Sequence, residues 1–73
     1  MKRTKVESSN ITSIGYNPQK TLLEIEFNNG SIYQYHPVTE AQHKELMAAS
    51  SQGSWFYKNI RSNGDIKSKN MTS

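Results

Sequence analysis

Five side chains in this sequence have the chemistry to hold single-stranded nucleic acid. Tyr33 and Tyr35 alternate along a predicted strand, and Tyr57, Lys58 and Arg61 lie close together in a later segment. Aromatic rings stack on unpaired bases, at about 1 to 3 kcal/mol per base, and Lys and Arg side chains neutralise phosphates. If RNA binds, we expect it on the surface formed by Tyr57, Lys58 and Arg61.

The two strand tyrosines also have a purely structural interpretation, which we favour. A tyrosine beside Leu23 and Ile25 generally buries its ring under a helix and leaves its hydroxyl in water. The strand pairing proposed below puts Tyr33 and Tyr35 in that position. A third and weaker interpretation is a small-ligand pocket bounded by Tyr33, Tyr35 and His36.

The positive charge is concentrated near the two ends of the chain. Nine Lys and Arg residues against six Asp and Glu residues give a net charge of +3. The terminal cations are Lys2, Arg3, Lys5, Lys58, Arg61, Lys67 and Lys69. Exposed lysines at polar ends most often serve solubility alone. This layout forms a phosphate-attracting patch if the two ends meet on one face, and the nucleic-acid interpretation expects folding to gather these cations around exposed aromatic rings.

The other reactive side chains show no catalytic or metal-binding pattern. His36 and His43 are seven positions apart in a chain without cysteine, which is no standard zinc spacing. Glu24 and Glu26 are predicted to face solvent, and Glu40 suits the first turn of a helix. We therefore expect no enzyme activity, no cofactor and no metal.

The chain of 73 residues has room for one core, built on three predicted strands at 9–16, 21–27 and 31–36. Between the last two strands, a three-residue loop ending in a left-handed Gly30 sets Ile25 opposite Tyr33 and Leu23 opposite Tyr35. A two-residue turn would mix polar with apolar side chains. We therefore favour the three-residue loop, and we also expect a bulge near Ser13 or Gly15 in the first strand.

Two helices are predicted after the strands. Thr39 and Gln42 form a capping box that begins a helix from Glu40 to about Ser50. Ser54 is a plausible cap for a short aromatic helix, for which a strand remains an alternative. The predicted fold is α+β: a three-stranded antiparallel β-meander covered on one face by an α-helix and a short C-terminal aromatic helix. Residues 6–61 form this domain, between a flexible basic N-terminus (1–5) and a flexible polar tail (62–73).

The order and spacing of short motifs over residues 6–61 resemble the KTSC domain. These motifs are Val6-Glu7-Ser8-Ser9-Asn10-Ile11 with Ile14-Gly15-Tyr16, Leu23-Glu24-Ile25-Glu26-Phe27 with Gly30, Tyr33-Gln34-Tyr35, and Gly53-Ser54-Trp55-Phe56 with Ile60-Arg61. The family is named for the C-terminus of certain lysyl-tRNA synthetases and also occurs as single-domain bacterial and phage proteins. The resemblance implies contact with RNA by association. The chain departs from the family where Trp55, Phe56 and Tyr57 replace the usual tyrosine, phenylalanine and asparagine.

These observations favour a small non-enzymatic binding module for RNA or another nucleic acid. The alternative is a protein-interaction module, in which Trp55 and an open sheet edge dock on a partner or on a second copy. The longest apolar stretches are three residues, so no membrane-spanning segment is predicted. A cytoplasmic location is the default expectation.

Overall fold

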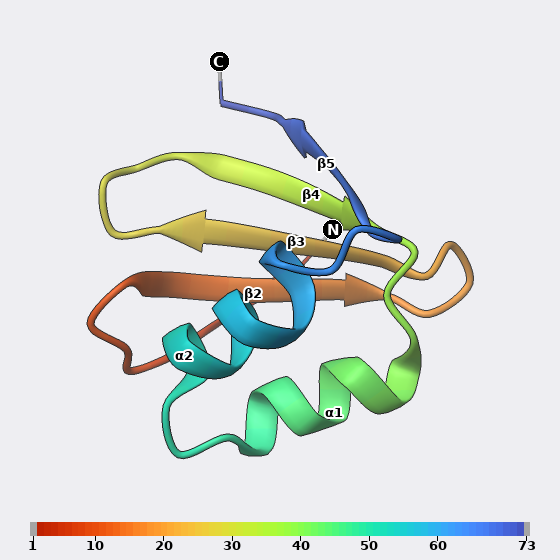
Figure 1. The fold of residues 1–73 in the computed structure, drawn as a ribbon. Helices are drawn as coiled ribbons and strands as arrows, with labels where there is room; N and C mark the ends of the chain where they lie inside the picture. The colour runs from red at the N-terminus through yellow and green to blue at the C-terminus, as the bar shows by residue number, and fades with distance from the viewer. Residues whose placement is uncertain (1, 73) are drawn as a thin grey trace.

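The computed structural model describes residues 2–72 as a five-stranded antiparallel sheet with helices against one face (Figure 1). The strands are β1 (Arg3–Lys5), β2 (Ile11–Asn17), β3 (Leu22–Phe27), β4 (Ile32–His36) and β5 (Lys67–Asn70), and they lie side by side in this order. The helical layer is α1 (Glu40–Ala48), α2 (Gln52–Phe56) and the π-helical turn η1 (Tyr57–Arg61). The helical layer lies between β4 and β5 in the sequence. After η1 the chain returns to the edge of the sheet, where β5 pairs with β4.

The three central strands have the predicted register. Ile25 lies opposite Tyr33, and Leu23 lies opposite Tyr35, which confirms the three-residue loop. Gly30 has φ of 90°, a left-handed conformation that favours glycine. The register of β2 against β3 shifts between Ile11 and Ser13, so the predicted bulge is present there. Burial of one apolar face was therefore sufficient to choose the pairing.

The prediction of three strands was wrong, because β1 pairs with β2 and β5 pairs with β4. Their sequences, Arg-Thr-Lys and Lys-Ser-Lys-Asn, show no alternation of apolar and polar side chains. Both are held to the sheet through backbone hydrogen bonds, which any residue except proline can donate. They come from the segments predicted to be flexible, and that flexibility stays a prediction. Met1 and Ser73 lie outside the described residues.

The helices close one core over the sheet. The capping box of Thr39 and Gln42 is present, as predicted, but α2 begins after Ser51 and not after Ser54. The buried apolar residues are Ile11, Ile14, Leu23, Ile25, Tyr35, Val38, Leu46, Phe56 and Ile60. In the described part of the chain, no helix has the length and apolar character needed to cross a bilayer.

A stacked pair of rings holds α1 against the end of β2. The rings of Tyr16 and His43 are 4.6 Å apart and inclined by 12°, and the Tyr16 hydroxyl donates to the Val38 carbonyl at 2.6 Å. Burial lowers the pKa of His43, although the nearby Glu40 charge opposes this shift. His43 is thus a half-buried side chain that packs against Tyr16.

Candidate functional site

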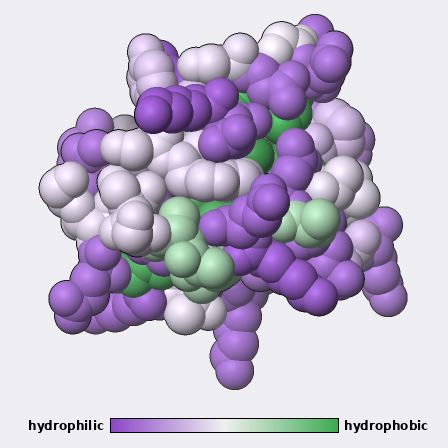
Figure 2. Space-filling model, turned by 60° about the horizontal axis from the view of Figure 1, so that its bottom comes forward, coloured by the Kyte–Doolittle hydropathy of each residue, from purple (hydrophilic) through white to green (hydrophobic). Residues whose placement is uncertain are grey.

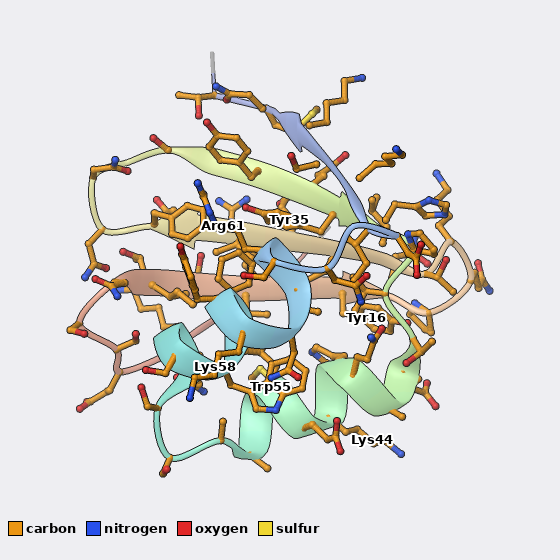
Figure 3. All side chains as sticks on the ribbon, viewed as in Figure 1. Tyr16, Tyr35, Lys44, Trp55, Lys58 and Arg61 are labelled. Carbon is orange, nitrogen blue, oxygen red and sulfur yellow. The ribbon has the colours of Figure 1, made fainter. Side chains whose placement is uncertain are left out.

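The five side chains predicted to contact nucleic acid line one cleft of about 750 Å³. Tyr33 and Tyr35 reach it from β4, while Tyr57, Lys58 and Arg61 come from η1. Figure 3 shows Lys58 and Arg61 on the helical segment that lies over the sheet, on the same side as Tyr35. The two predicted groups, far apart in sequence, are therefore brought together by the fold.

Aromatic rings form the floor of the cleft and join it to the core. The Phe56 ring meets Tyr35 at 5.1 Å and Phe27 at 5.6 Å, both edge to face. Tyr33 stacks near Tyr35 at 6.3 Å and meets Phe27 edge to face at 6.0 Å. Tyr35 is only 4% exposed, and burial raises its pKa against the opposing charge of Arg61. The structural interpretation is thus confirmed for Tyr35, while Tyr33 is half-buried.

Tyr57 presents the exposed ring of the cleft. It is 59% exposed, and the Arg61 guanidinium carbon lies 5.9 Å from the centre of its ring, within the range of a cation–π contact. The two residues lie in a π-helical turn, in which the Ser62 amide donates to the Tyr57 carbonyl at 3.1 Å. π-Helical turns are rare and occur frequently at functional sites. The segment that carries the exposed ring and both cations is therefore also the least regular helix of the fold.

The cleft is positively charged. Its lining includes Lys58 and Arg61 but no aspartate or glutamate. Among residues 2–72 every ion pair involves Arg3, so neither cation of the cleft has a carboxylate partner there. Two unneutralised cations beside an exposed ring suit a ligand that is both anionic and aromatic.

Two polar loops form the rim of the cleft, and the sequence did not predict their role. Ser9 and Asn10 precede β2, and Asn28 to Ser31 join β3 to β4. Asn28 holds the loops together, because its Nδ2 donates to the Ser9 carbonyl at 2.8 Å and its Oδ1 accepts from Thr12 at 2.6 Å. The available signal was their density of serine and asparagine, which is equally typical of turns.

The N-terminal cations do not join the cleft, contrary to the expectation that folding gathers both ends. Opposed residues of paired strands share a face, and Gly15 lies opposite both Arg3 and Glu24. Glu24 alternates with Leu23 and Ile25, so Arg3 lies on the face away from the helices. There it forms an ion pair with Glu24 and donates to Ser13 at 3.0 Å.

The pairing of β4 with β5 corrects two further expectations, which concern the C-terminal lysines and His36. Lys69 lies opposite Gln34 and Lys67 opposite His36, so these lysines also belong to the face away from the helices. His36 follows Tyr35 in the strand and points to the other face, so it does not bound a pocket with Tyr33 and Tyr35. Lys58 and Arg61 are the cations that line the cleft.

Glu24 is less exposed than predicted, because a polar network covers it. It is 9% exposed and accepts from the Gln34 amide at 3.0 Å as well as from Arg3. Burial by itself would raise the pKa of Glu24, but the hydrogen bonds from Gln34 and Arg3 and the Arg3 charge hold it below its usual value. Glu26 accepts from Ser13 at 2.9 Å, and its carboxylate lies 4.0 Å from the guanidinium of Arg3 in β1. Both carboxylates thus help to fix β1 on the sheet.

The features predicted for a protein interface are less exposed than expected. Trp55 is half-buried and packs against the core, and Figure 3 shows it on the side of α2 that faces α1. The outer strands of the predicted meander are covered by β1 and β5. In Figure 2, hydrophobic surface is confined to small areas among hydrophilic side chains on the face that is seen.

An antiparallel sheet with a helical layer on one face and a basic aromatic cleft between them defines a small α+β domain. The chain belongs to the KTSC domain family, whose model matches residues 7–63. The resemblance seen in the motifs is thereby confirmed.

Solved and sequenced relatives support this assignment. The crystal structure of a KTSC domain protein from Yersinia pestis superposes with a TM-score of 0.87, at 37% identity over 96% of both chains. An uncharacterised protein from Stutzerimonas stutzeri is 39% identical over 56 residues, which are 77% of this chain and 79% of that protein. A lysine–tRNA ligase from Nostoc sp. is 40% identical over 57 residues, but these cover 78% of this chain and only 10% of the ligase.

Proposed function

We propose that this KTSC domain is a non-enzymatic module that binds single-stranded nucleic acid, RNA in particular, in the cleft of Tyr57, Lys58 and Arg61. The observation that carries the proposal is the pairing of an exposed ring with two cations that lack carboxylate partners within residues 2–72. A base stacks on the ring while the cations neutralise neighbouring phosphates. A double helix presents no free base to stack and fits the cleft less well.

The partial match to a lysine–tRNA ligase supports RNA over DNA. A domain of this family within an enzyme named for tRNA associates the fold with an RNA substrate. An RNA-binding role also implies a cytoplasmic location, where most cellular RNA is found. The activity of the ligase itself is not proposed for this chain.

The observations favour nucleic acid over a protein partner. Trp55 is half-buried, which leaves less of its ring available as an anchor for docking. The sheet ends in β1 and β5, two short strands that carry lysines, and such edges resist pairing with a further strand. The cleft, in contrast, offers charge and an exposed ring in one place.

The salt dependence of binding tests this proposal. Fluorescence anisotropy with a labelled ten-nucleotide single-stranded RNA is expected to show affinity falling as salt rises. Two phosphates neutralised by Lys58 and Arg61 predict a slope of about −1.4 in log K against log salt, because each contributes about −0.7 on a single strand. A duplex of the same sequence should bind more weakly. Absence of binding at low salt, or an affinity that does not respond to salt, would contradict the proposal.

A further inference from the structure

The side chain of Asn10 has no evident role in the fold. Its backbone amide donates to Ser8 Oγ at 3.2 Å and its carbonyl accepts from the Asn28 amide at 3.0 Å. Its side-chain amide forms no hydrogen bond with residues 2–72. The other two asparagines of the rim differ, because Asn28 bonds through both amide atoms and Asn29 Oδ1 accepts from the Ser31 amide at 3.0 Å.

The exposed side chain of Asn10 lies in the wall of the cleft, against Gly53. It packs against Gly53 of α2, where an added Cβ would lie 3.2 Å from Asn10 Nδ2 and 3.6 Å from Asn10 Cβ. The absence of a side chain at Gly53 therefore makes room for this amide. Both residues line the same cleft as Tyr57 and Arg61.

The three chemical groups lie along one side of the helical segment. Tyr57 follows Gly53 by one turn, and its amide donates to the Gly53 carbonyl. Arg61 lies a further turn along η1. The α-helical rise of about 1.5 Å per residue sets an upper limit of about 12 Å between Gly53 and Arg61, because the π-helical turn is wider and shorter. An amide, an aromatic ring and a guanidinium are thus arranged in that order along the cleft.

The size of the cleft limits the ligand that the Asn10 amide, the Tyr57 ring and the Arg61 guanidinium can bind together. Sites for one small molecule have volumes of about 300 to 1,000 Å³, and the cleft of about 750 Å³ lies within this range. Tyr57 is the one ring of its lining that is mostly exposed. The site therefore has one stacking position, whereas proteins that follow a long single strand use several.

We propose that the cleft takes one unpaired nucleotide, with its base stacked on Tyr57, the edge of the base read by Asn10, its own phosphate held by Arg61, and the neighbouring phosphate of a strand held by Lys58. This inference rests on the proposed function and narrows it. A side-chain amide offers a donor and an acceptor side by side, which match the donor and acceptor on the edge of a base. The nucleotide is either free or part of a single strand, since both present the same base and phosphate.

An NMR titration with the four nucleoside 5′-monophosphates and with oligonucleotides of two, four and eight residues tests the inference. The wild-type protein is compared with Asn10→Ala and with the control Gln19→Ala, which removes an exposed amide from the distant β2–β3 turn. We expect one base to be preferred. Asn10→Ala should lose at least about 5-fold in affinity for that nucleotide and abolish the preference, because a good amide–base pair is worth about 1 to 3 kcal/mol. The slope of log K against log salt should be the same for Asn10→Ala as for the wild type. The affinity and the base preference of the Gln19→Ala control should also equal those of the wild type.

The length series separates failure of the inference from failure of the proposed function. From two residues upward, we expect the affinity of the oligonucleotides to rise by no more than the number of equivalent binding positions, and we expect a free monophosphate to compete at the same site. A steeper rise, equal affinity for all four bases, or an unchanged preference in Asn10→Ala overturns the inference but leaves nucleic-acid binding in place. If neither a nucleotide nor an oligonucleotide binds at low salt, the proposed function fails and the inference fails with it.

Discussion

Replacement of Tyr35 with alanine is expected to lower the free energy of unfolding by about 3 to 5 kcal/mol, the usual cost of truncating a buried aromatic side chain. Tyr35 is 4% exposed and its ring contacts those of Phe56 and Tyr33. A domain of 73 residues has a total stability of roughly 4 to 11 kcal/mol at typical values per residue. The loss removes nearly all of the stability at the lower end of this range and leaves about 6 to 8 kcal/mol at the upper end.

Urea denaturation followed by circular dichroism and by Trp55 fluorescence measures this loss. Tyr57→Ala is the matched control, since it removes the same side chain from an exposed position of the same cleft. Its stability should change by no more than about 0.5 kcal/mol. Equal stability of the two variants would show that Tyr35 is not part of the core.

Joint replacement of Lys58 and Arg61 with alanine is expected to reduce the affinity for single-stranded RNA by roughly 60-fold at about 50 mM salt. Each cation that neutralises a phosphate contributes about 0.7 to the slope of log K against log salt, which corresponds to roughly 8-fold at this salt concentration. Both side chains are exposed and take part in no ion pair among residues 2–72, so stability should change little.

The double variant Lys67→Ala/Lys69→Ala is the control for net charge. It removes the same charge from β5, on the face of the sheet away from the helices. Its affinity should remain within a few fold of the wild type, as measured by anisotropy at the same salt concentration. Similar losses in both double variants would mean that net charge, and not the cleft, attracts the RNA.

The central part of the fold could be predicted because the decisive signals are local or periodic. Gly30 and the alternation of Leu23 and Ile25 chose one register, and Thr39 with Gln42 marked the start of α1. β1 and β5 could not be predicted, because they carry no apolar alternation and are held through their backbones. The start of α2 was placed three residues late, since Ser51 and Ser54 are equally good caps by residue type.

The candidate site was predictable where its residues are neighbours in sequence. Tyr57, Lys58 and Arg61 lie in one turn, so their common surface did not depend on the rest of the fold. The position of Asn10 in the wall of the cleft could not be predicted, because its place beside Gly53 depends on how α2 packs on the loop before β2. The expectation that Arg3 joins the aromatic surface was wrong for a similar reason. The pairing of β1 with β2 decides which face of the sheet the Arg3 side chain occupies.

The location of the RNA on the protein tests the central claim most directly. Titration of the ¹⁵N-labelled protein with a short single-stranded RNA, followed by amide chemical shifts, reports this location. We predict that the largest shifts fall on residues 57–61 and on Asn10 and Asn29, while residues 3–5 and 67–69 change little. Shifts concentrated on β1 and β5 would contradict the account, because they would place the RNA on the opposite face of the sheet.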